Sequence, residues 1–202
     1  MVVDAIGVAA ILTGLARSWP QVLHIVNRPD VRGVSTSTWL LWLCAAVTWL
    51  IIGLVEHIAA IVVSNGLNAL GGLTVLALLV RRHALSWWRP ALTAVAAVAV
   101  NLAAYGAIGA AGPSVLGMGI SISMFVPQAV TVLRRSIAGV SLLSWTLALV
   151  AATLWSVYGL LANEFVLVVP GLVMVPAAAV IVWRVGVGSR ELRRLPSWSR
   201  DG

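Results

Sequence analysis

The sequence predicts an all-α integral membrane protein with seven transmembrane helices, arranged as two parallel three-helix bundles joined by a linker helix (3+1+3). Its composition, the alternation of its charges and an internal repeat lead to this prediction. Of the 202 residues, 61% are hydrophobic and 9% are charged, with a mean hydropathy of +1.03. Soluble domains are about 45–50% apolar and about 25% charged. The surplus excludes a water-soluble globular protein.

Seven apolar stretches, each bounded by polar or charged residues, account for most of the chain. At about 20 apolar residues per membrane span, a chain of this length has no room for a large domain outside the bilayer. Backbone polar groups in lipid must be satisfied within the segment, so we expect these stretches to be helices rather than strands. The predicted spans are 5–26, 37–55, 58–80, 91–111, 114–133, 142–161 and 165–185.

The basic side chains predict the orientation of these spans. All 13 are arginines, and all except Arg17 lie at the ends of apolar stretches, after spans one, three, five and seven. The connections after spans two, four and six carry acidic or neutral residues. Because basic residues mark cytoplasmic loops, we expect a multi-pass protein of the cell (plasma or inner) membrane, with the N-terminus outside and a cytoplasmic basic tail at 187–202. Because these arginines lie in the predicted cytoplasmic loops, the net charge of +7 does not indicate a nucleic-acid partner.

Several other features bound the function. Cys44 is single, which excludes an intrachain disulfide, and the N-terminus lacks the basic segment of a cleaved signal peptide. We find no metal-ligand cluster, phosphate-binding loop or nucleophile–base set, so we expect neither an enzyme nor a bound metal or cofactor. No carboxylate lies in mid-membrane to relay protons, and His24 is expected at the interface. These features favour passive transport or binding.

Residues 20–55 are repeated at 127–161 after one gap at Pro29, with fourteen of the 35 aligned positions identical. Three helices reverse the direction of the chain and a single linker span reverses it again, so both repeats run in the same sense. Parallel repeats occur in transporters, with the substrate near the midplane between the halves; a seven-helix receptor needs no duplication. The expected organisation is a first repeat at 1–83, a linker span at 84–113, a second repeat at 114–186 and the tail at 187–202. The identical pairs include Pro20/Pro127, Gln21/Gln128, Arg28/Arg135, Gly33-Val34-Ser35/Gly139-Val140-Ser141, Trp39/Trp145, Trp49/Trp155 and Gly53/Gly159.

Each repeat has Pro-Gln late in its first helix, a short basic loop, Gly-Val-Ser, and Trp-x-x-[Ile/Tyr]-Gly at the end of its second helix. This pattern resembles the PQ-loop superfamily and, within it, the SWEET and SemiSWEET sugar transporters. The layout looks like full-length SWEETs rather than half-size SemiSWEETs, which must dimerise. The resemblance implies a passive, bidirectional uniporter of small sugars (mono- or disaccharides) in the lipid bilayer that works by alternating access; homo-oligomers are possible.

Pro20 and Pro127 lie inside helices, where each removes a backbone hydrogen bond and clashes with the preceding turn. Each proline is either a static kink, which membrane helices tolerate, or the hinge that the resemblance favours. Gln21 and Gln128 either satisfy the freed carbonyls or hydrogen-bond to neighbouring helices. Plant-type SWEETs also have prolines in the second helix of each unit, and this chain has none there, so we expect no complete proline ring.

Trp49 and Asn65 match a Trp and an Asn that line the sugar pocket of SemiSWEETs. An indole face packs against the apolar face of a pyranose ring, and an amide both donates to and accepts from sugar hydroxyls. The alternatives are an interfacial belt Trp and a helix-packing Asn.

The second repeat departs from this pattern. Trp155 matches Trp49, but Gly171 stands where the first repeat has Asn65, which predicts an asymmetric pocket with room beside Gly171. Asn68, one turn beyond Asn65, and Asn101, in the linker span, either line the pathway or hold helices together.

Arg17 lies about ten residues, or about 15 Å, from the cytoplasmic end of its helix, and the second repeat has Met124 in its place. An intramembrane charge is a functional-site hypothesis by default. Arg17 is a snorkelled or carbonyl-bonded structural residue, part of a gating pair, or a contact for an anionic or polyhydroxylated substrate. The rival functions are a PQ-loop carrier of another small polar solute, such as an amino acid that uses Arg17, and a non-transporting receptor or scaffold.

Overall fold

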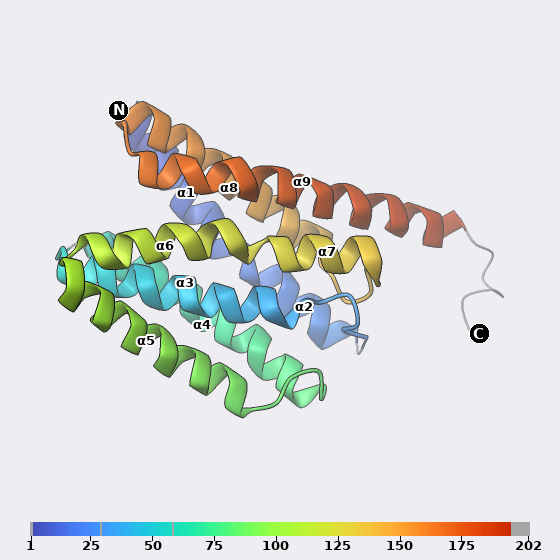
Figure 1. The fold of residues 1–202 in the computed structure, drawn as a ribbon. Coiled ribbons are helices and arrows are strands. Elements are labelled where there is room, and N and C mark those ends of the chain that lie inside the picture. The colour runs from blue at the N-terminus through green and yellow to red at the C-terminus, as the bar shows by residue number, and fades with distance from the viewer. Residues whose placement is uncertain (1, 29, 58, 195–202) are drawn as a thin grey trace.

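The computed structural model describes residues 2–28, 30–57 and 59–194, which form nine α-helices (Figure 1). Two consecutive pairs, α1–α2 and α6–α7, are each one span with a break. The described part therefore contains seven helices that are long and apolar enough to cross a membrane. The predicted all-α, seven-span fold is confirmed. The helices are α1 (Val2–Ala16), α2 (Ser18–Asn27), α3 (Thr36–Val55), α4 (Ala59–Arg81), α5 (Trp88–Ile108), α6 (Ala111–Met124), α7 (Val126–Arg134), α8 (Leu142–Ala162) and α9 (Phe165–Arg194).

The helix that contains the seventh span is longer than predicted, because α9 continues to Arg194. Residues 187–194 of the predicted tail are therefore helical, while residues 195–202 lie outside the described part. The helix continues past the end of the apolar stretch because no proline or glycine pair interrupts residues 189–194.

Both breaks lie just before a proline. Pro20 has no N–H to donate to the carbonyl of Ala16, and its ring clashes with that carbonyl; the span breaks at Arg17, between α1 and α2. Pro127 has the same effect, and α6 gives way to α7 at Phe125. The two prolines thus produce matching kinks in the first span of each sequence repeat.

Ser35 and Ser141 begin the second span of each repeat in the same way. The hydroxyl of Ser35 accepts a hydrogen bond from the N–H of Thr38 (3.3 Å), and that of Ser141 accepts one from the N–H of Ser144 (3.2 Å). A serine N-cap satisfies one of the otherwise unpaired N–H groups of a helix start. The serine of the repeated Gly-Val-Ser motif therefore fixes where α3 and α8 start.

Helices of the two repeats pack against each other. The span α1–α2 and the span α6–α7 run the same way in Figure 1, and α1 packs on α8 while α6 packs on α3. The linker α5 lies against α3 and α6. Asn101 of α5 is buried and donates to Thr48 Oγ1 of α3 (2.9 Å) and to the carbonyl of Ala97 (2.8 Å). Of the two interpretations of Asn101, its contacts are those of a helix-packing residue.

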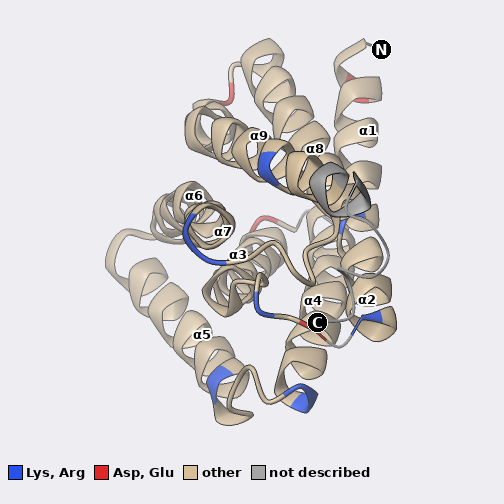
Figure 2. Ribbon diagram, turned by 90° about the vertical axis from the view of Figure 1, so that its right-hand side faces the viewer, with Lys and Arg blue, Asp and Glu red and all other residues tan. Residues whose placement is uncertain are grey.

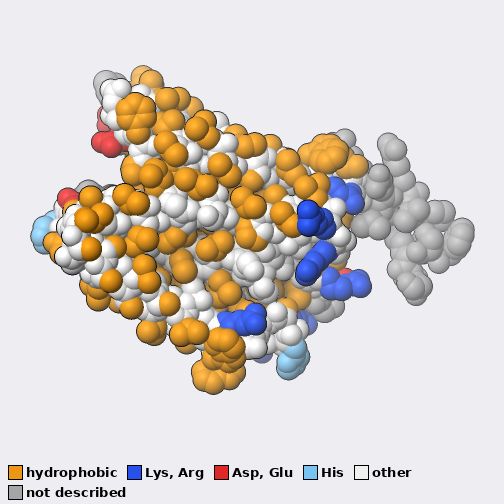
Figure 3. Space-filling view, viewed as in Figure 1, with side chains coloured by type: hydrophobic (Ala, Val, Ile, Leu, Met, Phe, Trp, Pro, Cys, Tyr) orange, Lys and Arg blue, Asp and Glu red, His pale blue; other side chains and the backbone are white. Residues whose placement is uncertain are grey.

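Arginines gather at one end of the helices and exposed acidic residues at the other (Figure 3). Figure 2 views the molecule from the side of the arginines and shows them spread over the ends of several helices. We call these two ends the basic end and the acidic end. The basic end carries Arg28, Arg32, Arg81, Arg82, Arg89, Arg134, Arg135 and Arg184, and the acidic end carries Asp4, Glu56 and Glu164.

The buried core lies in the half of the molecule near the basic end. On α4, Val75, Leu76 and Leu79 are fully buried, whereas Val63 and Leu67, nearer the acidic end, are exposed. On α9 the buried core side chains Ala178, Ile181 and Val185 likewise lie late in the helix, although Pro170 and Gly171 are also buried. Near the acidic end, Figure 3 shows the surface notched between the α8–α9 lobe and the lobe that contains α6. The helices are thus packed together at the basic end and parted at the acidic end.

Candidate functional site

The amide of Gln21 joins α2 to the loop that precedes α8, in the other repeat. Its Nε2 donates to the carbonyl of Gly139 (2.6 Å), and its Oε1 accepts from the N–H of Ser141 (3.0 Å). Gln21 is 1% exposed. Both polar atoms of the Gln21 amide therefore hydrogen-bond to the main chain of the loop that precedes α8.

Gln128 of α7 makes the same pair of bonds in the reverse direction. Its Nε2 donates to the carbonyl of Gly33 (2.7 Å), and its Oε1 accepts from the N–H of Ser35 (2.8 Å). We call the two sets of bonds the reciprocal clamp. Neither glutamine bonds to the carbonyls that the prolines free, so of the two sequence-based interpretations only the bonding to neighbouring elements holds.

The two loops touch where the clamp binds them. The N–H of Gly33 donates to the carbonyl of Ala138 (2.9 Å). A Cβ on Gly33 would lie 2.7 Å from the carbonyl oxygen of Ala138, and Gly139 has a φ of +76°, which favours glycine. The glycine of each Gly-Val-Ser motif is therefore needed for the loops to approach.

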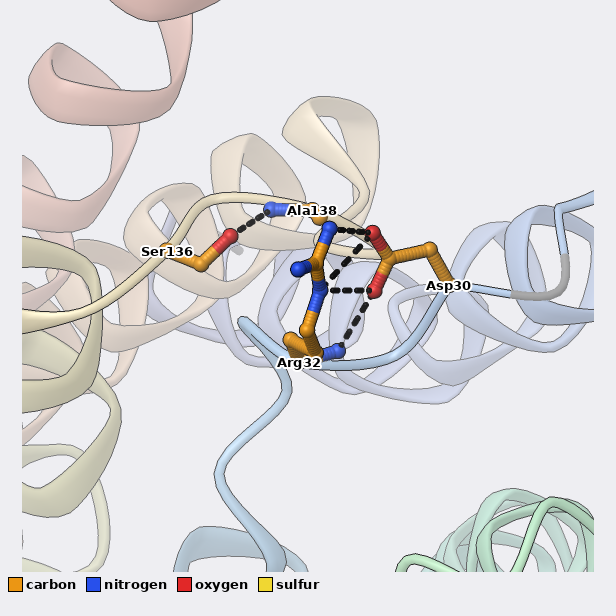
Figure 4. Close-up of polar contacts among 4 residues, drawn as sticks. All are labelled: Asp30, Arg32, Ser136 and Ala138. Carbon is orange, nitrogen blue, oxygen red and sulfur yellow. Dashed lines mark hydrogen bonds and ion pairs between the residues drawn. The ribbon is translucent and has the colours of Figure 1, made fainter. Parts of the chain in front are cut away.

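Residues beside the clamp stabilise each loop locally (Figure 4). Asp30 accepts hydrogen bonds from Arg32 Nε (3.0 Å) and Arg32 Nη2 (2.7 Å), and from the Arg32 backbone N–H (3.0 Å). These bonds lower the pKa of the Asp30 carboxyl, the side-chain bonds most. In the opposing loop, Ser136 Oγ accepts from the N–H of Ala138 (3.0 Å).

An aromatic layer of four rings from both repeats lies next to the clamp, on the side of the acidic end. Trp39 and Trp42 stack with ring centroids 5.2 Å apart, and Phe125 meets Trp145 edge-on, also at 5.2 Å. All four are almost fully buried. The clamp and this layer close the interior from the basic end.

Arg17 lies at this aromatic layer. Its guanidinium carbon is 3.4 Å from the centroid of the Trp42 ring and 5.9 Å from that of Phe125. Its backbone carbonyl accepts a hydrogen bond from Ser144 Oγ of α8. Tryptophan is the best aromatic partner for a cation, so the side chain ends inside the protein rather than at the membrane surface.

The structure places Trp49 and Asn65 at the same height. Gly53 packs against Ile61 where α3 and α4 meet, with a built Cβ 2.9 Å from Ile61 Cγ2. Trp49 precedes Gly53 by one turn and Asn65 follows Ile61 by one turn. Because α3 and α4 are antiparallel, both residues lie one turn farther from the acidic end than this contact. Trp49 also packs against Gly117 of α6. Asn65 Nδ2 donates to the carbonyl of Ile61 (3.0 Å), which uses one half of its amide.

Trp155 occupies the corresponding place on α8, with its ring edge-on to Tyr158 (5.8 Å). The expected room beside Gly171 is absent, because the side chain of Ser156 fills the position that a Cβ of Gly171 would take. Leu50 and Asn65 in the first repeat thus correspond to Ser156 and Gly171 in the second. The comparison of Asn65 with Gly171 alone predicted an empty space. The space is filled because Ser156, on the neighbouring helix α8, also differs from its counterpart Leu50.

Asn68 lies one turn closer to the aromatic layer than Asn65, and its Oδ1 is buried without a hydrogen-bond partner in the described part of the chain. Two surface hollows occur elsewhere: one at the α4–α5 connection, lined by residues including His83 and Trp87, and one at the acidic end beside Gly53 and His57. Neither is lined by the predicted pocket residues, which lie between the helices.

Comparison with known proteins agrees with this geometry. Residues 2–59 match the PQ loop repeat family model. The fold is similar to the 3.7 Å resolution structure of a eukaryotic SWEET transporter, with a TM-score of 0.61, 16% sequence identity, and coverage of 94% of this chain and 100% of the other. Residues 2–59 thus carry a PQ loop repeat, and the chain has the same fold as that SWEET transporter. None of the curated proteins compared with it matches.

The functional geometry includes residues that the sequence had not assigned to a site. The Gly-Val-Ser motif was visible as a repeat, but only the structure shows that its main chain is the partner of the opposite glutamine. Trp42 and Phe125, which flank Arg17, differ between the repeats and gave no sequence signal. The repeated identities alone could have indicated Ser35 and Ser141, because a motif kept in both halves suggests a shared contact.

Proposed function

We propose that this protein is a passive, bidirectional uniporter of small sugars that works by alternating access. The observation that carries the proposal is the reciprocal clamp, which holds the basic end closed while the helices part at the acidic end. In this proposal the basic end faces the cytoplasm, since arginines mark cytoplasmic loops. The structure then corresponds to a state that opens outward.

Transport requires the opposite state, in which the clamp releases and the basic end opens. The kinks before Pro20 and Pro127 are the positions at which the first span of each repeat can bend, because the backbone bonds there are already missing. Four buried hydrogen bonds are lost on opening and the exposed groups gain water in exchange. A net value of about 0.5–1.5 kcal/mol per bond is small enough for thermal motion to open the clamp.

The substrate in this proposal binds between the helices at the height of Trp49 and Trp155. Their indole faces suit pyranose rings, and the free half of the Asn65 amide accepts from a hydroxyl. Similarity to a SWEET transporter supports the sugar class. Without a proton relay, the gradient of the sugar is the driving force.

The test is uptake of radiolabelled glucose and sucrose into proteoliposomes that contain the purified chain. We expect equilibration without accumulation, unaffected by collapse of a pH gradient. Trp49→Ala and Asn65→Ala are expected to reduce flux at least tenfold. Trp183→Ala is the matched control, because Trp183 is 62% exposed on the outer face of α9 and its loss should leave flux unchanged.

Sugar flux that neither pocket substitution changes would remove the proposed pocket. Flux of an amino acid, but of no sugar, would favour a PQ-loop carrier of another polar solute. No flux of any solute would favour a receptor or scaffold.

A further inference from the structure

Arg17 has no carboxylate partner among the residues that the structure describes. Its guanidinium makes no hydrogen bond to any residue in the described part of the chain, and its Nε is fully buried without an acceptor. The acidic residues with described side chains lie at the two ends; Asp4, on the same helix, is thirteen residues away, or about 20 Å. A buried charge without a partner is costly, and the Trp42 face compensates only part of that cost.

Other polar atoms without a partner lie on the elements that pack around Arg17. In the described residues, the buried side-chain atoms without a hydrogen-bond partner include Ser18 Oγ, Thr38 Oγ1 and Asn68 Oδ1. Ser18 is the next residue in the chain, and Thr38 lies one turn from Trp42 on α3. Buried polar groups are almost always paired, so such a concentration indicates a place where a polar ligand binds.

Asn68 lies at nearly the same height along the helix axes as Arg17. A Cβ on Gly71 would lie 2.8 Å from Ser18 Cβ, which fixes the height of α4 against the first span. Both helices run from the acidic to the basic end. Asn68 precedes Gly71 by one turn, and Gly14 precedes Ser18 by about one turn, so these two residues lie side by side just beyond Arg17.

There is space next to these groups. Gly14 is buried, yet a Cβ built on it would meet no atom within 4 Å. This space lies about one turn of helix from Arg17.

We propose that Arg17 binds the carboxylate of a monoanionic sugar, so that the substrate class of this transporter includes sugar acids. The inference rests on the proposed function. A carboxylate accepts two parallel bonds from a guanidinium fork. Trp42 covers one face of the Arg17 guanidinium, and its Nε has no acceptor among the described residues. A sugar hydroxyl supplies a donor for Asn68 Oδ1, which lies on the acidic-end side of the aromatic layer.

The single positive charge selects between anions. One arginine neutralises one carboxylate, whereas a phosphate monoester carries nearly two negative charges at neutral pH and would leave one of them unpaired between the helices. The second repeat has Met124 in the equivalent position, so no second cation completes a phosphate site. The site therefore favours a carboxylate.

Glucose and glucuronate test this in proteoliposomes, because the two differ only in a carboxylate that replaces one CH₂OH group. We expect wild type to carry both, and Arg17→Met to lower glucuronate flux at least tenfold relative to glucose flux. Arg17→Lys should retain an intermediate glucuronate flux, since the charge remains but the fork is lost. Arg28→Gln, which removes an exposed charge from the end of the same span, should change neither flux.

Two further measurements use only the wild-type protein, so they do not depend on whether a variant folds. Unlabelled glucuronate should compete with labelled glucose more strongly than glucose 6-phosphate does. A membrane potential of about 100 mV, positive inside, should accumulate glucuronate about 50-fold, because it is worth about 2.3 kcal/mol per elementary charge and 1.4 kcal/mol is tenfold. Glucose should reach equal concentrations on both sides.

Glucose transport without glucuronate transport or competition would overturn the inference and leave the proposed function standing. A glucuronate-to-glucose flux ratio that Arg17→Met does not change would also overturn it. Stronger competition by glucose 6-phosphate would overturn the choice of carboxylate. If wild type carries neither sugar, the proposed function itself fails.

Discussion

Removing one glutamine of the reciprocal clamp should shift the protein toward a state that is open at the basic end. Gln21→Leu leaves the Gly139 carbonyl and the Ser141 N–H without partners in the closed state. Each buried unsatisfied group costs about 1–3 kcal/mol, so the closed state loses about 2–6 kcal/mol. The open state loses little, because water reaches both groups there. The expected population shift is about 30-fold or more, since 1.4 kcal/mol is tenfold.

Thiol labelling measures this shift. Cys44, the single cysteine, is first replaced by alanine, and Val34→Cys then places a reporter in the loop, where Val34 is 7% exposed. A membrane-impermeant maleimide applied from the basic end should label this thiol at least about 30-fold faster when Gln21→Leu is present. Gln128→Leu should have a similar effect, because it breaks the equivalent pair of bonds.

The matched control is Asn27→Leu, which removes an exposed amide from the end of α2. Its labelling rate should equal that of the parent. An unchanged rate in a folded Gln21→Leu protein would refute the reasoning, because the two orphaned groups would then cost nothing in the closed state.

Three further predictions concern the residues around the clamp. Gly139→Ala should also speed labelling, because φ is +76° there and such strain costs about 1–3 kcal/mol; Gly186→Ala, with only one atom at 4.0 Å from its Cβ, should not. Trp42→Ala should destabilise the protein by about 3–5 kcal/mol and lower the melting temperature in detergent, more than Trp42→Phe does; equal melting temperatures would contradict the buried packing of the Trp42 ring. Hydrogen bonds from Arg32 lower the pKa of Asp30 below 3.8, so their stabilisation is present at neutral pH and is lost as the pH falls through that lowered pKa. The small stability difference between wild type and Asp30→Asn should therefore shrink on acidification from pH 7 to pH 3, and a growing difference would contradict this.

The span count and the kinks could be predicted from the sequence because they depend on local properties. Apolar length sets the number of spans, and Pro20 and Pro127 break helices through their own rings wherever the chain goes. The end of α9 was less predictable: the apolar stretch ends well before Arg194, but helix formation continued beyond it.

Contacts between the repeats could not be derived in the same way. Gln21 and Gly139 are 118 residues apart, and nothing in either segment alone shows that one binds the other. Gly171 illustrates the same limit, because the space beside it depends on Ser156 of another helix. The sequence identified Arg17 as unusual, but only the structure shows its ring partner, Trp42, and the polar atoms around it.

The reciprocal clamp binds main chain only, and this frees the loops to diverge. Apart from the two glycines that let the loops approach, a loop residue presents its carbonyl and N–H whatever its side chain, so a mutation there need not be matched by a change in the opposing glutamine. The duplicated halves illustrate this latitude: Asp30-Val31-Arg32 in one loop corresponds to Ser136-Ile137-Ala138 in the other. The bonds that join the two halves therefore do not depend on the side chains that differ between the loops. Each loop can gain or lose charged residues without weakening these bonds.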